Sequence, residues 1–551
     1  MALVLLNLGI VFINVLLNKW NNKFYDALQY KDYRVFFHLL IGFSWLAGIY
    51  IVFAVYQLYL NQMLKIRWRR WLTDQYLRTW VNERAYYRMQ LAGGVDNPDQ
   101  RIEEDVPSFI SGTLTLVIGG MRAVVSMISF VAILWGLSGA LTIHISGHPF
   151  ALPGYLVWAA LLYAFVGTWL THRIGHRLVR LNFDQQRYEA DFRFSLVRFR
   201  ENAEGVALYQ GEASELRNFG ERFAGIVRNW WDIMRQQKRL TWFSSGYAQA
   251  AVIFPIIMVA PRYFGGKILL GGLMQTVDAF GQVQDALSFV ISSYTDIASW
   301  TSVVDRLSEF RNALAGVQAE ASSSDGIRRA GCHACLNVNG VDLNLPDGQP
   351  LITDVNLSIA RGDTALLRGP SGAGKSTLFR AIAGIWPFGR GQVQVPSDSR
   401  VLFLPQKPYL PIGTLGDLVS YPTSADAVEH EILRDALEAV ELPEFAGRLT
   451  ESGHWALQLS PGEQQRIAFA RALVQKPDWL FLDEATSALD EATESRLYEM
   501  LRRRLPKTTL FSVGHRETLR RFHSRQLVLQ PNGNGPASIV EMPALERTKA
   551  S

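Results

Sequence analysis

The chain has 551 residues, which is long enough for two or more domains. Hydrophobic residues make up 48% of it, which is high for a soluble protein of this length, and they concentrate before about residue 300. The formal net charge is only +5, and the arginines gather in particular loops, so the basic balance fits membrane orientation better than nucleic-acid binding. The composition therefore predicts a membrane half followed by a soluble half, with membrane lipid and not nucleic acid as a partner.

Six apolar runs in the first half predict membrane spans. The first, residues 2–17, is short for a span of about 20 residues, so we expect the chain to begin inside a longer first helix. This run lacks the charged n-region and the small-residue cleavage site of a signal peptide. The later runs cover residues 35–60, 109–137, 151–170 and 242–260, and a weaker sixth lies near 273–297.

The distribution of arginine predicts the orientation of these spans. The long connections 65–108 and 172–239 are rich in arginine, whereas the loop at 142–150 contains neither Lys nor Arg. Because basic residues are retained on the cytosolic side, we expect both long connections and both termini in the cytosol, and the loop at 142–150 outside.

The sixth run has a polar face, which allows two interpretations. Polar residues recur at three- and four-residue steps, as on one side of a helix: Gln275, Asp278, Gln282, Asp285, Ser288, Ser292 and Asp296. The other side carries Phe280, Val283, Leu287, Val290, Tyr294 and Ile297. Because a carboxylate facing lipid is costly, the stripe either lines an aqueous path for a hydrophilic or cationic cargo or serves the ordinary packing of a helix that extends into the cytosol.

Residues 312–330 have the composition of a linker. Directly after them stand Cys332 and Cys335 in Cys-His-Ala-Cys, a spacing found in redox pairs and in half of a metal site. No second cysteine pair exists, and we place this stretch in the reducing cytosol. We therefore favour a reduced pair of minor structural importance.

A glycine-rich stretch in the second half predicts a phosphate-binding loop. Residues 364–367 read as a short apolar strand and 378–385 have helical composition. Between them come Gly369, Pro370, Ser371, Gly372, Ala373, Gly374, Lys375, Ser376 and Thr377. This spacing points backbone N–H groups at a bound anion. Lys375 would reach the β- and γ-phosphates of ATP, and the Ser376 hydroxyl would bind Mg²⁺.

Two carboxylates end a second buried strand, residues 479–482. Open α/β sheets bind ligands at the carboxyl ends of their strands. Asp483 therefore suits the Mg²⁺ shell, and Glu484 suits the polarisation of an attacking water as a general base.

A third motif, Leu459-Ser460-Pro461-Gly462-Glu463, has the spacing of a capped helix start. Here the chain resembles the ATPases of ABC transporters, whose signature motif is Leu-Ser-Gly-Gly-Gln or a close variant. Pro461 and Glu463 depart from that form, whereas Ser460 and Gly462 are retained. The resemblance implies that these two residues bind the γ-phosphate held by the opposite subunit.

The same resemblance assigns three further residues. Gln406 matches the Q-loop, which senses Mg²⁺ and contacts the membrane domain; Asp490 ends a D-loop at the dimer interface; and His515 matches the switch histidine that contacts the γ-phosphate. The family's adenine-stacking aromatic is missing, since no Phe, Tyr or Trp occurs between Phe310 and Phe379. We expect Leu345 or Pro346 to cover the base instead.

Segments of the membrane half narrow the resemblance to subfamily D, the peroxisomal fatty-acyl transporters, and to their bacterial BacA-like relatives, which take up peptides and cobalamin. The segments that carry it are Asn97–Ile102, Glu189–Arg193, Glu204–Gly211 and Ala260–Phe264. It implies a homodimer with two ATP sites in the bacterial inner membrane, with its ATPase in the cytosol. The cargo would be a peptide, a cobalamin-like or another hydrophilic solute.

Three other functions would fit parts of this sequence. Transport of a fatty-acyl or lipid-type cargo stays open, and so does a membrane ATPase that regulates a partner without moving a solute. A soluble ABC ATPase of DNA repair or translation is disfavoured by the apolar runs and their charge asymmetry.

The expected fold is an α-helical six-span membrane domain, similar to type IV exporters, followed by an α/β P-loop ATPase. We expect the membrane domain at 1–311, the linker at 312–330, the ATPase domain at 331–540 and a tail at 541–551.

Overall fold

The computed structural model describes residues 1–91, 93, 97–145, 148–322, 326–332, 335–531 and 535–542. The chain divides into two compact units. One comprises Met1–Arg78 with Asn97–Arg311, and the other comprises Thr79–Asp96 with Asn312–Ser551. The second unit therefore includes a short piece of the first cytosolic connection.

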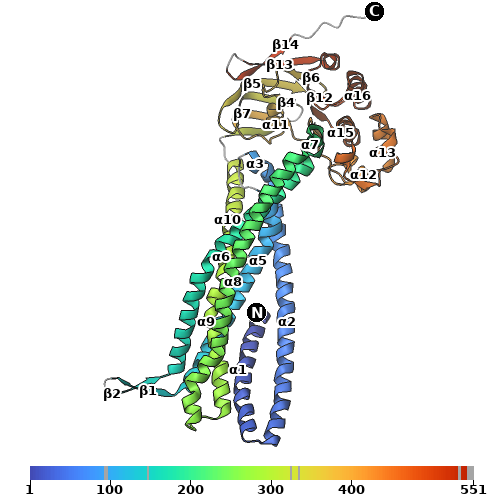
Figure 1. Cartoon of the computed structure of the whole chain (residues 1–551). Helices are drawn as coiled ribbons and strands as arrows, with labels where there is room; N and C mark the ends of the chain where they lie inside the picture. Colours follow the sequence, from blue (N-terminus) through green and yellow to red (C-terminus); the bar gives the residue numbers. More distant parts are fainter. Residues whose placement is uncertain are drawn as a thin grey trace, which may run out of the picture. The chain divides into compact units, whose positions relative to one another are not determined.

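Long helices that run side by side make up the first unit (Figure 1). These are α1 (Ala2–Gln29), α2 (Tyr33–Val81), α5 (Val106–Ser138), α6 (Tyr155–Glu201), α8 (Glu212–Phe264), α9 (Leu270–Ser292) and α10 (Tyr294–Ser322). Shorter pieces are α4 (Pro98–Gln100), a π-helical turn at Arg101–Asp105 and α7 (Ala203–Tyr209). At 1.5 Å per residue, α6 and α8 are each roughly 70–80 Å long, more than twice the thickness of a hydrocarbon core. Both helices therefore continue well beyond the bilayer.

Among the described residues, five helical segments are long and apolar enough to cross a membrane: Ala2–Gln29, Tyr33–Leu91, Pro98–Ser138, Tyr155–Glu201 and Glu212–Phe264. The sixth predicted span corresponds to α9, whose glutamines and aspartates lower its hydropathy. Nevertheless α9 packs against α1, α5, α6 and α8. Its Phe280 and Val283 are fully buried in the apolar core of this unit, so α9 is a central helix of the bundle.

The predicted polar face of α9 is partly satisfied by α1. Asn18 is fully buried and donates to Asp278 Oδ2 over 2.6 Å, and Gln275 donates to Asn18 Oδ1 over 3.0 Å. Asn22 donates to Gln275 Oε1 over 2.7 Å. These bonds support the packing interpretation for the first turns of α9, whereas Asp285 is exposed. The side chains of Val290, Ser292 and Tyr294 lie outside the described part of the chain.

Two expectations for the ends of spans need correction. α1 continues past residue 17 to Gln29, because its polar second half is bonded to α9. The fourth run was expected to begin at residue 151, whereas residues 148–153 form β2 (His148–Pro153), which pairs with β1 (Ala140–Ile145), and α6 begins at Tyr155. Ser146 and Gly147 lie outside the described residues.

A ten-stranded mixed sheet organises the second unit, in the order β3-β7-β4-β5-β14-β13-β6-β12-β11-β8. The first six strands in this order are β3 (Ile327–Cys332), β7 (Gly389–Pro396), β4 (Cys335–Asn344), β5 (Pro350–Ala360), β14 (Ala537–Met542) and β13 (Arg525–Pro531), and their pairing is mixed. The last four strands pair in parallel and are β6 (Thr364–Arg368), β12 (Thr509–Val513), β11 (Trp479–Asp483) and the edge strand β8 (Val401–Leu404). Among the helices, α11 (Lys375–Ile382), α15 (Pro461–Gln475) and α16 (Glu491–Arg504) position the site described below.

The parallel register brings three strand ends to one edge of this sheet. Asp483 of β11 lies beside Val513 of β12, and Val513 lies beside Leu367 of β6. The first four residues of β11 are buried, as the apolar run predicts. The residues that follow these strands therefore converge, which is the reason that motifs separated by more than a hundred residues form one site.

The predicted linker is largely regular structure. Residues 312–322 continue α10, and Ile327–Cys332 form β3, which pairs in parallel with β7. Ser323, Ser324 and Asp325 lie outside the described residues. The helix continues because Ala, Gln and Glu favour helices, a preference that the serine-rich end of the stretch obscures.

The cysteine pair is oxidised, contrary to the expected reduced pair. Cys332 and Cys335 form a disulfide across the β3–β4 connection, with their Cα atoms 6.1 Å apart. This separation lies within the range that a disulfide bridges, and the pairing of β3 and β4 with β7 brings the two residues together.

Candidate nucleotide site

The phosphate loop connects β6 to α11, as predicted. Gly374 is the N-cap of α11 and has φ +98°, a conformation that favours glycine. A Cβ at Gly374 would lie 2.8 Å from Ile352 Cδ1, so a side chain there would also clash with β5. The loop therefore requires glycine where its backbone turns into the helix, and a helix start of this kind would direct its N–H groups at a bound anion.

Lys375 and Ser376 point into this loop. The Lys375 ammonium is buried and donates to the carbonyls of Gly369 and Pro370 over 3.1 and 2.9 Å. Burial lowers the pKa of Lys375, and the neighbouring carboxylates Glu484 and Asp483 oppose that shift. A cation held in this way against the loop lies beside the groups that would bind phosphate oxygens.

Ser376 and Asp483 meet directly. The Ser376 hydroxyl donates to Asp483 Oδ1 over 2.9 Å. Burial raises the pKa of Asp483, and the bond from Ser376 opposes that rise. A hydroxyl and a carboxylate at this distance form the hard-oxygen pair that Mg²⁺ prefers, so the donor set fits the predicted metal.

Three of the predicted residues meet at Glu484. Gln406 Nε2 donates to Glu484 Oε2 over 3.2 Å, and His515 Nε2 lies 3.0 Å from Glu484 Oε1. Glu484 itself has φ +48°, a left-handed conformation that is costly for a residue with a side chain. Backbone strain of this kind is typical of functional positions, and here the two neighbouring loops hold the carboxylate in place.

The signature segment begins α15 with a complete capping box. Glu463 N donates to the Ser460 hydroxyl, and Glu463 Oε2 accepts from Ser460 N and Oγ over 2.7 and 2.8 Å. Gly462 packs close to Leu489, since a Cβ there would lie 3.2 Å from Leu489 Cδ2. The predicted helix start is confirmed, and among the described residues no hydrogen bond joins Ser460 to the phosphate loop of its own chain.

Asp490 is the N-cap of α16. Its carboxylate accepts from Thr493 N and from Thr493 Oγ1 over 2.8 and 2.9 Å. These bonds lower the pKa of Asp490. The assignment of Asp490 to ATP binding across a dimer stays a prediction.

Gln465 was not singled out by the sequence analysis, although it lies in the signature segment. Its side chain is almost fully buried, donates to Gln406 O and Ser487 Oγ over 3.0 Å each, and accepts from Ala488 N over 2.9 Å. It therefore ties the Q-loop to the D-loop.

Glu494 of α16 was also not predicted. It is buried, and its carboxylate accepts from Thr486 Oγ1 over 2.6 Å and from Thr518 Oγ1 over 3.0 Å. Arg516 Nη1 lies 3.6 Å from the same carboxylate. Glu494 thus joins the chain after Glu484 to the chain after His515. A single acidic residue in a helical sequence does not indicate whether its side chain is buried, so this role could not be predicted.

Comparison with known proteins gives two family matches. A family model described as "ABC transporter transmembrane region 2" matches residues 1–264, and one described as "ABC transporter" matches residues 352–487.

Three relatives resemble nearly the whole chain. An Escherichia coli (strain K12) protein named "Inner membrane ABC transporter ATP-binding protein YddA" is 35% identical over 92% of this chain and 89% of its own. The Arabidopsis thaliana "ABC transporter D family member 2, chloroplastic" is 34% identical over 98% of this chain and 83% of its own. The human "Lysosomal cobalamin transporter ABCD4" is 29% identical over 93% and 88%.

A solved structure supports the fold. The structure titled "Structure of a bacterial Atm1-family ABC exporter with ATP bound" superposes with a TM-score of 0.74, covers 96% of this chain and 92% of that chain, and is 19% identical.

Proposed function

Since this chain belongs to the ABC transporters, as a half-transporter of the subfamily D type, we propose that two copies form a homodimer that moves a hydrophilic solute across the bacterial inner membrane. The chain is a multi-pass integral membrane protein with a cytosolic ATPase domain that binds and hydrolyses ATP, and hydrolysis is coupled to transport. We propose, in addition, that the chain forms a dimer, that it binds Mg²⁺, that the site residues have the roles given below, and that the cargo is hydrophilic.

The convergence of Gln406, Asp483, Glu484 and His515 beside the phosphate loop is the observation that carries this proposal. Glu484 would act as the general base on the attacking water, because its carboxylate is held by Gln406 and His515 at the edge where the strands end. Lys375 and the loop N–H groups would bind the β- and γ-phosphates. Ser376, Asp483 and Gln406 would hold Mg²⁺, which neutralises phosphate charge when bound.

Dimerisation would complete the site. The chain has one membrane domain and one ATPase domain, and its capped signature helix offers Ser460 and Gly462 away from the hydrogen bonds of its own phosphate loop. A γ-phosphate held by one copy would be bound by these residues of the other copy, giving two composite ATP sites.

A short helix, α3 (Ala85–Leu91), gives this ATPase unit a route to the membrane domain. Arg84, just before it, donates to the carbonyl of Ala383 over 2.8 Å, at the end of the helix that starts at Lys375. Met89 is buried in the same unit. Movement of α11 on ATP binding would therefore act on the chain segment that follows α2.

The polar face of α9 favours a hydrophilic or cationic cargo, such as a peptide, over a fatty-acyl chain. Asp285 is exposed, and its carboxylate in the dimer would occur twice along the path. The relative named a lysosomal cobalamin transporter supports a cobalamin-like cargo as a further choice.

Transport assays in vesicles of opposite orientation test this proposal. Purified protein is reconstituted, and ATP-dependent movement of labelled peptides, cobalamin and fatty acyl-coenzyme A is measured in inside-out and right-side-out vesicles. We expect one hydrophilic class to move in one direction only and to stimulate hydrolysis. Hydrolysis without movement of any cargo would favour a regulator, and movement of the acyl cargo alone would favour the lipid-type alternative.

A further inference from the structure

Hydrogen bonds between the antiparallel helices α6 and α8 show which residues of the two helices lie opposite each other. Tyr163 donates through its hydroxyl to Tyr247 O over 2.6 Å, and Tyr247 donates to Tyr163 O over 2.8 Å. Toward the cytosol, Gln236 donates to Ile174 O. Residues 163 and 174 of α6 therefore lie at the levels of 247 and 236 of α8.

Two exposed tryptophans lie at one level between these pairs. Trp169 on α6 is 56% exposed and Trp242 on α8 is 78% exposed. The register places Trp169 opposite residue 241, so both indoles lie at the cytosolic ends of the predicted spans. Tryptophan is enriched at the level of the lipid headgroups, because its ring is apolar and its N–H is polar.

Exposed cations follow within about two turns on the cytosolic side of the tryptophans. Arg173 and Arg177 on α6 and Lys238 and Arg239 on α8 are all exposed, and we call these four residues the cationic band. The described ion pairs nearest to them join Arg187 to Asp184 and Arg235 to Asp232. Within the part of the chain that the structure describes, no carboxylate pairs with any residue of the band.

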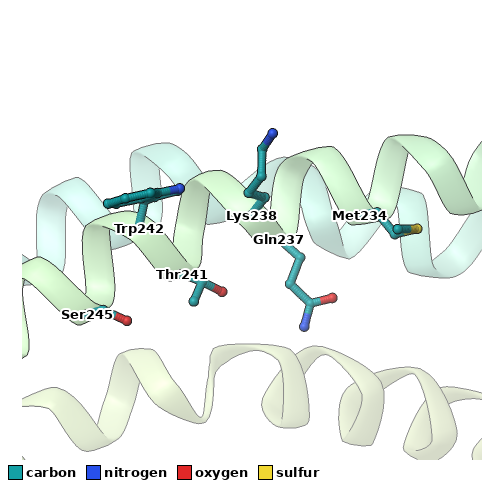
Figure 2. Close-up of a pocket in the computed structure, with 6 residues that line it drawn as sticks. All are labelled: Met234, Gln237, Lys238, Thr241, Trp242 and Ser245. Atoms are coloured by element: carbon teal, nitrogen blue, oxygen red, sulfur yellow. The ribbon is translucent and has the colours of Figure 1, made fainter.

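A groove on α8 lies at the same level. Its volume is about 580 Å³, and it is lined by Met234, Gln237, Lys238, Thr241, Trp242 and Ser245. Figure 2 shows Gln237, Thr241 and Ser245 along one side of the helix and Lys238 and Trp242 on the opposite edge. An ammonium, an amide, two hydroxyls and an indole offer donors to phosphodiester and ester oxygens, and the groove contains no acid among these residues.

We propose that the cationic band binds anionic phospholipid headgroups of the cytosolic leaflet, and that the groove beside Lys238 and Trp242 holds one such headgroup. The tryptophans would fix the depth of the helices, and the four cations would attract the phosphates that lie just beyond. Free phosphate lacks the acyl chains that would pack beside the indoles, so the lipid is the source to which the geometry points. The inference depends on orientation in the membrane and not on the identity of the cargo.

A matched pair of triple variants tests this site in the full-length protein. The test variant carries Arg173→Gln, Arg177→Gln and Lys238→Gln. The control carries Arg198→Gln, Arg200→Gln and Arg217→Gln, which removes the same charge from exposed positions on the same two helices. Arg198 lies roughly 37 Å beyond Arg173 at 1.5 Å per residue, several Debye lengths from the headgroups.

The apparent affinity for phosphatidylglycerol is measured from its effect on the thermal midpoint of the detergent-solubilised protein. Phosphatidylcholine is the control for a lipid without net charge, and glycerol phosphate is the control for a soluble phosphate without acyl chains. Each cation near an anionic surface contributes about fivefold to affinity, so the test variant should bind phosphatidylglycerol on the order of a hundredfold more weakly, whereas the control should match wild type. Unchanged midpoints in phosphatidylcholine confirm that the variants are folded.

A second variant, Thr241→Val with Ser245→Ala, examines the groove alone and should weaken binding of phosphatidylglycerol without changing its salt dependence. Equal affinities of the test and control triples would overturn the proposal. An equal effect of phosphatidylcholine, or reproduction of the effect by glycerol phosphate, would also overturn it. Because no transport is measured, these outcomes do not depend on the proposed function.

Discussion

The backbone and two neighbouring side chains fix the position of the Glu484 carboxylate. Its backbone adopts a left-handed conformation, and its two carboxylate oxygens contact Gln406 and His515. These two contacts come from two separate loops, so the position of the carboxylate depends on segments far from it in the sequence.

For Glu484→Gln we expect hydrolysis to fall by about 10²–10⁴-fold while ATP still binds, because loss of a general base removes the proton acceptor and leaves the phosphate loop intact. ATP should then trap a closed dimer. Single-turnover hydrolysis and nucleotide binding by the purified variant measure the two effects separately. Glu438→Gln, at an exposed position on the helix His430–Ala439, is the control. Wild-type turnover by Glu484→Gln would show that another group activates the water.

His523 makes stability depend on pH. It is buried, with Nδ1 2.8 Å from Leu519 O and Nε2 2.8 Å from Ser512 Oγ, and burial lowers its pKa to about 4. The unfolded state takes up a proton near pH 6.5, whereas the folded state does not until about pH 4. Between these values the unfolded state binds more protons, so the free energy of unfolding should fall with falling pH by up to about 1.4 kcal/mol per unit.

Thermal unfolding of wild type and His523→Gln between pH 7 and pH 4 measures this dependence. The variant should be less stable at pH 7, because the packing of the imidazole ring and its two hydrogen bonds are lost. Its stability should nevertheless change less with pH. Parallel pH profiles for the two proteins would show that His523 is not the responsible group.

Glu494 should stabilise the chain segments on both sides of the site through its two threonine contacts. Glu494→Ala would leave the buried Thr486 hydroxyl without its acceptor, at a cost of about 1–3 kcal/mol, and would remove the acceptor of the half-buried Thr518 hydroxyl at a smaller cost. Glu494→Gln keeps one acceptor oxygen and should recover part of the loss. Calorimetry of both variants gives the free energies, with the exposed Glu499→Ala as the control. Equal stability of Glu494→Ala and wild type would contradict the structural role.

The polar side chains of α9 have two different environments, although they form one stripe in the sequence. Asp278 is bonded to the buried Asn18 of α1, whereas Asp285 is exposed. One polar stripe therefore serves packing at its beginning and is accessible farther along.

We expect Asp285→Ala to lower uptake of a cationic cargo and the cargo-stimulated hydrolysis together, with little change in thermal stability. Asp278→Ala should instead destabilise the protein, because Asn18 loses its acceptor. Vesicle uptake and thermal midpoints of the two variants distinguish these effects. Unchanged uptake by Asp285→Ala would show that this carboxylate does not contact the cargo.

The elements also show what a local pattern can predict. The phosphate loop, the strand that ends at Asp483 and the helix that begins after Ser460 were predictable, since each depends on residues within one short window. The continuation of α1 to Gln29 was not, because Asn18 and Asn22 resemble a loop until α9 supplies their partners. The roles of Gln465 and Glu494 were not predictable for the same reason, since only tertiary packing buries them.

The disulfide was mispredicted for a related reason. Compartment and cysteine number favoured free thiols, whereas the pairing of β3 and β4 with β7 brings Cys332 and Cys335 to bonding distance. Strand pairing of this kind is not visible in the spacing of the two cysteines alone.

Hydrolysis by the transporter would require two copies of the chain acting together. The phosphate loop has its cation, its hydroxyl and its carboxylates within one chain, whereas Ser460 makes its hydrogen bonds with its own Glu463. If Ser460 binds the γ-phosphate held by a second copy, each ATP site takes its two halves from different subunits, and closing the sites moves both membrane domains at once.

The most direct test measures ATP hydrolysis by a mixed dimer of Lys375→Ala and Ser460→Arg subunits, purified with two different tags. Each homodimer should be inactive, because every composite site then contains one damaged half. The mixed dimer contains one site with the intact phosphate loop of one copy and the intact serine of the other, so we expect recovery of up to about half of wild-type hydrolysis. No recovery in the folded mixed dimer, or normal hydrolysis by either mutant homodimer, would contradict it.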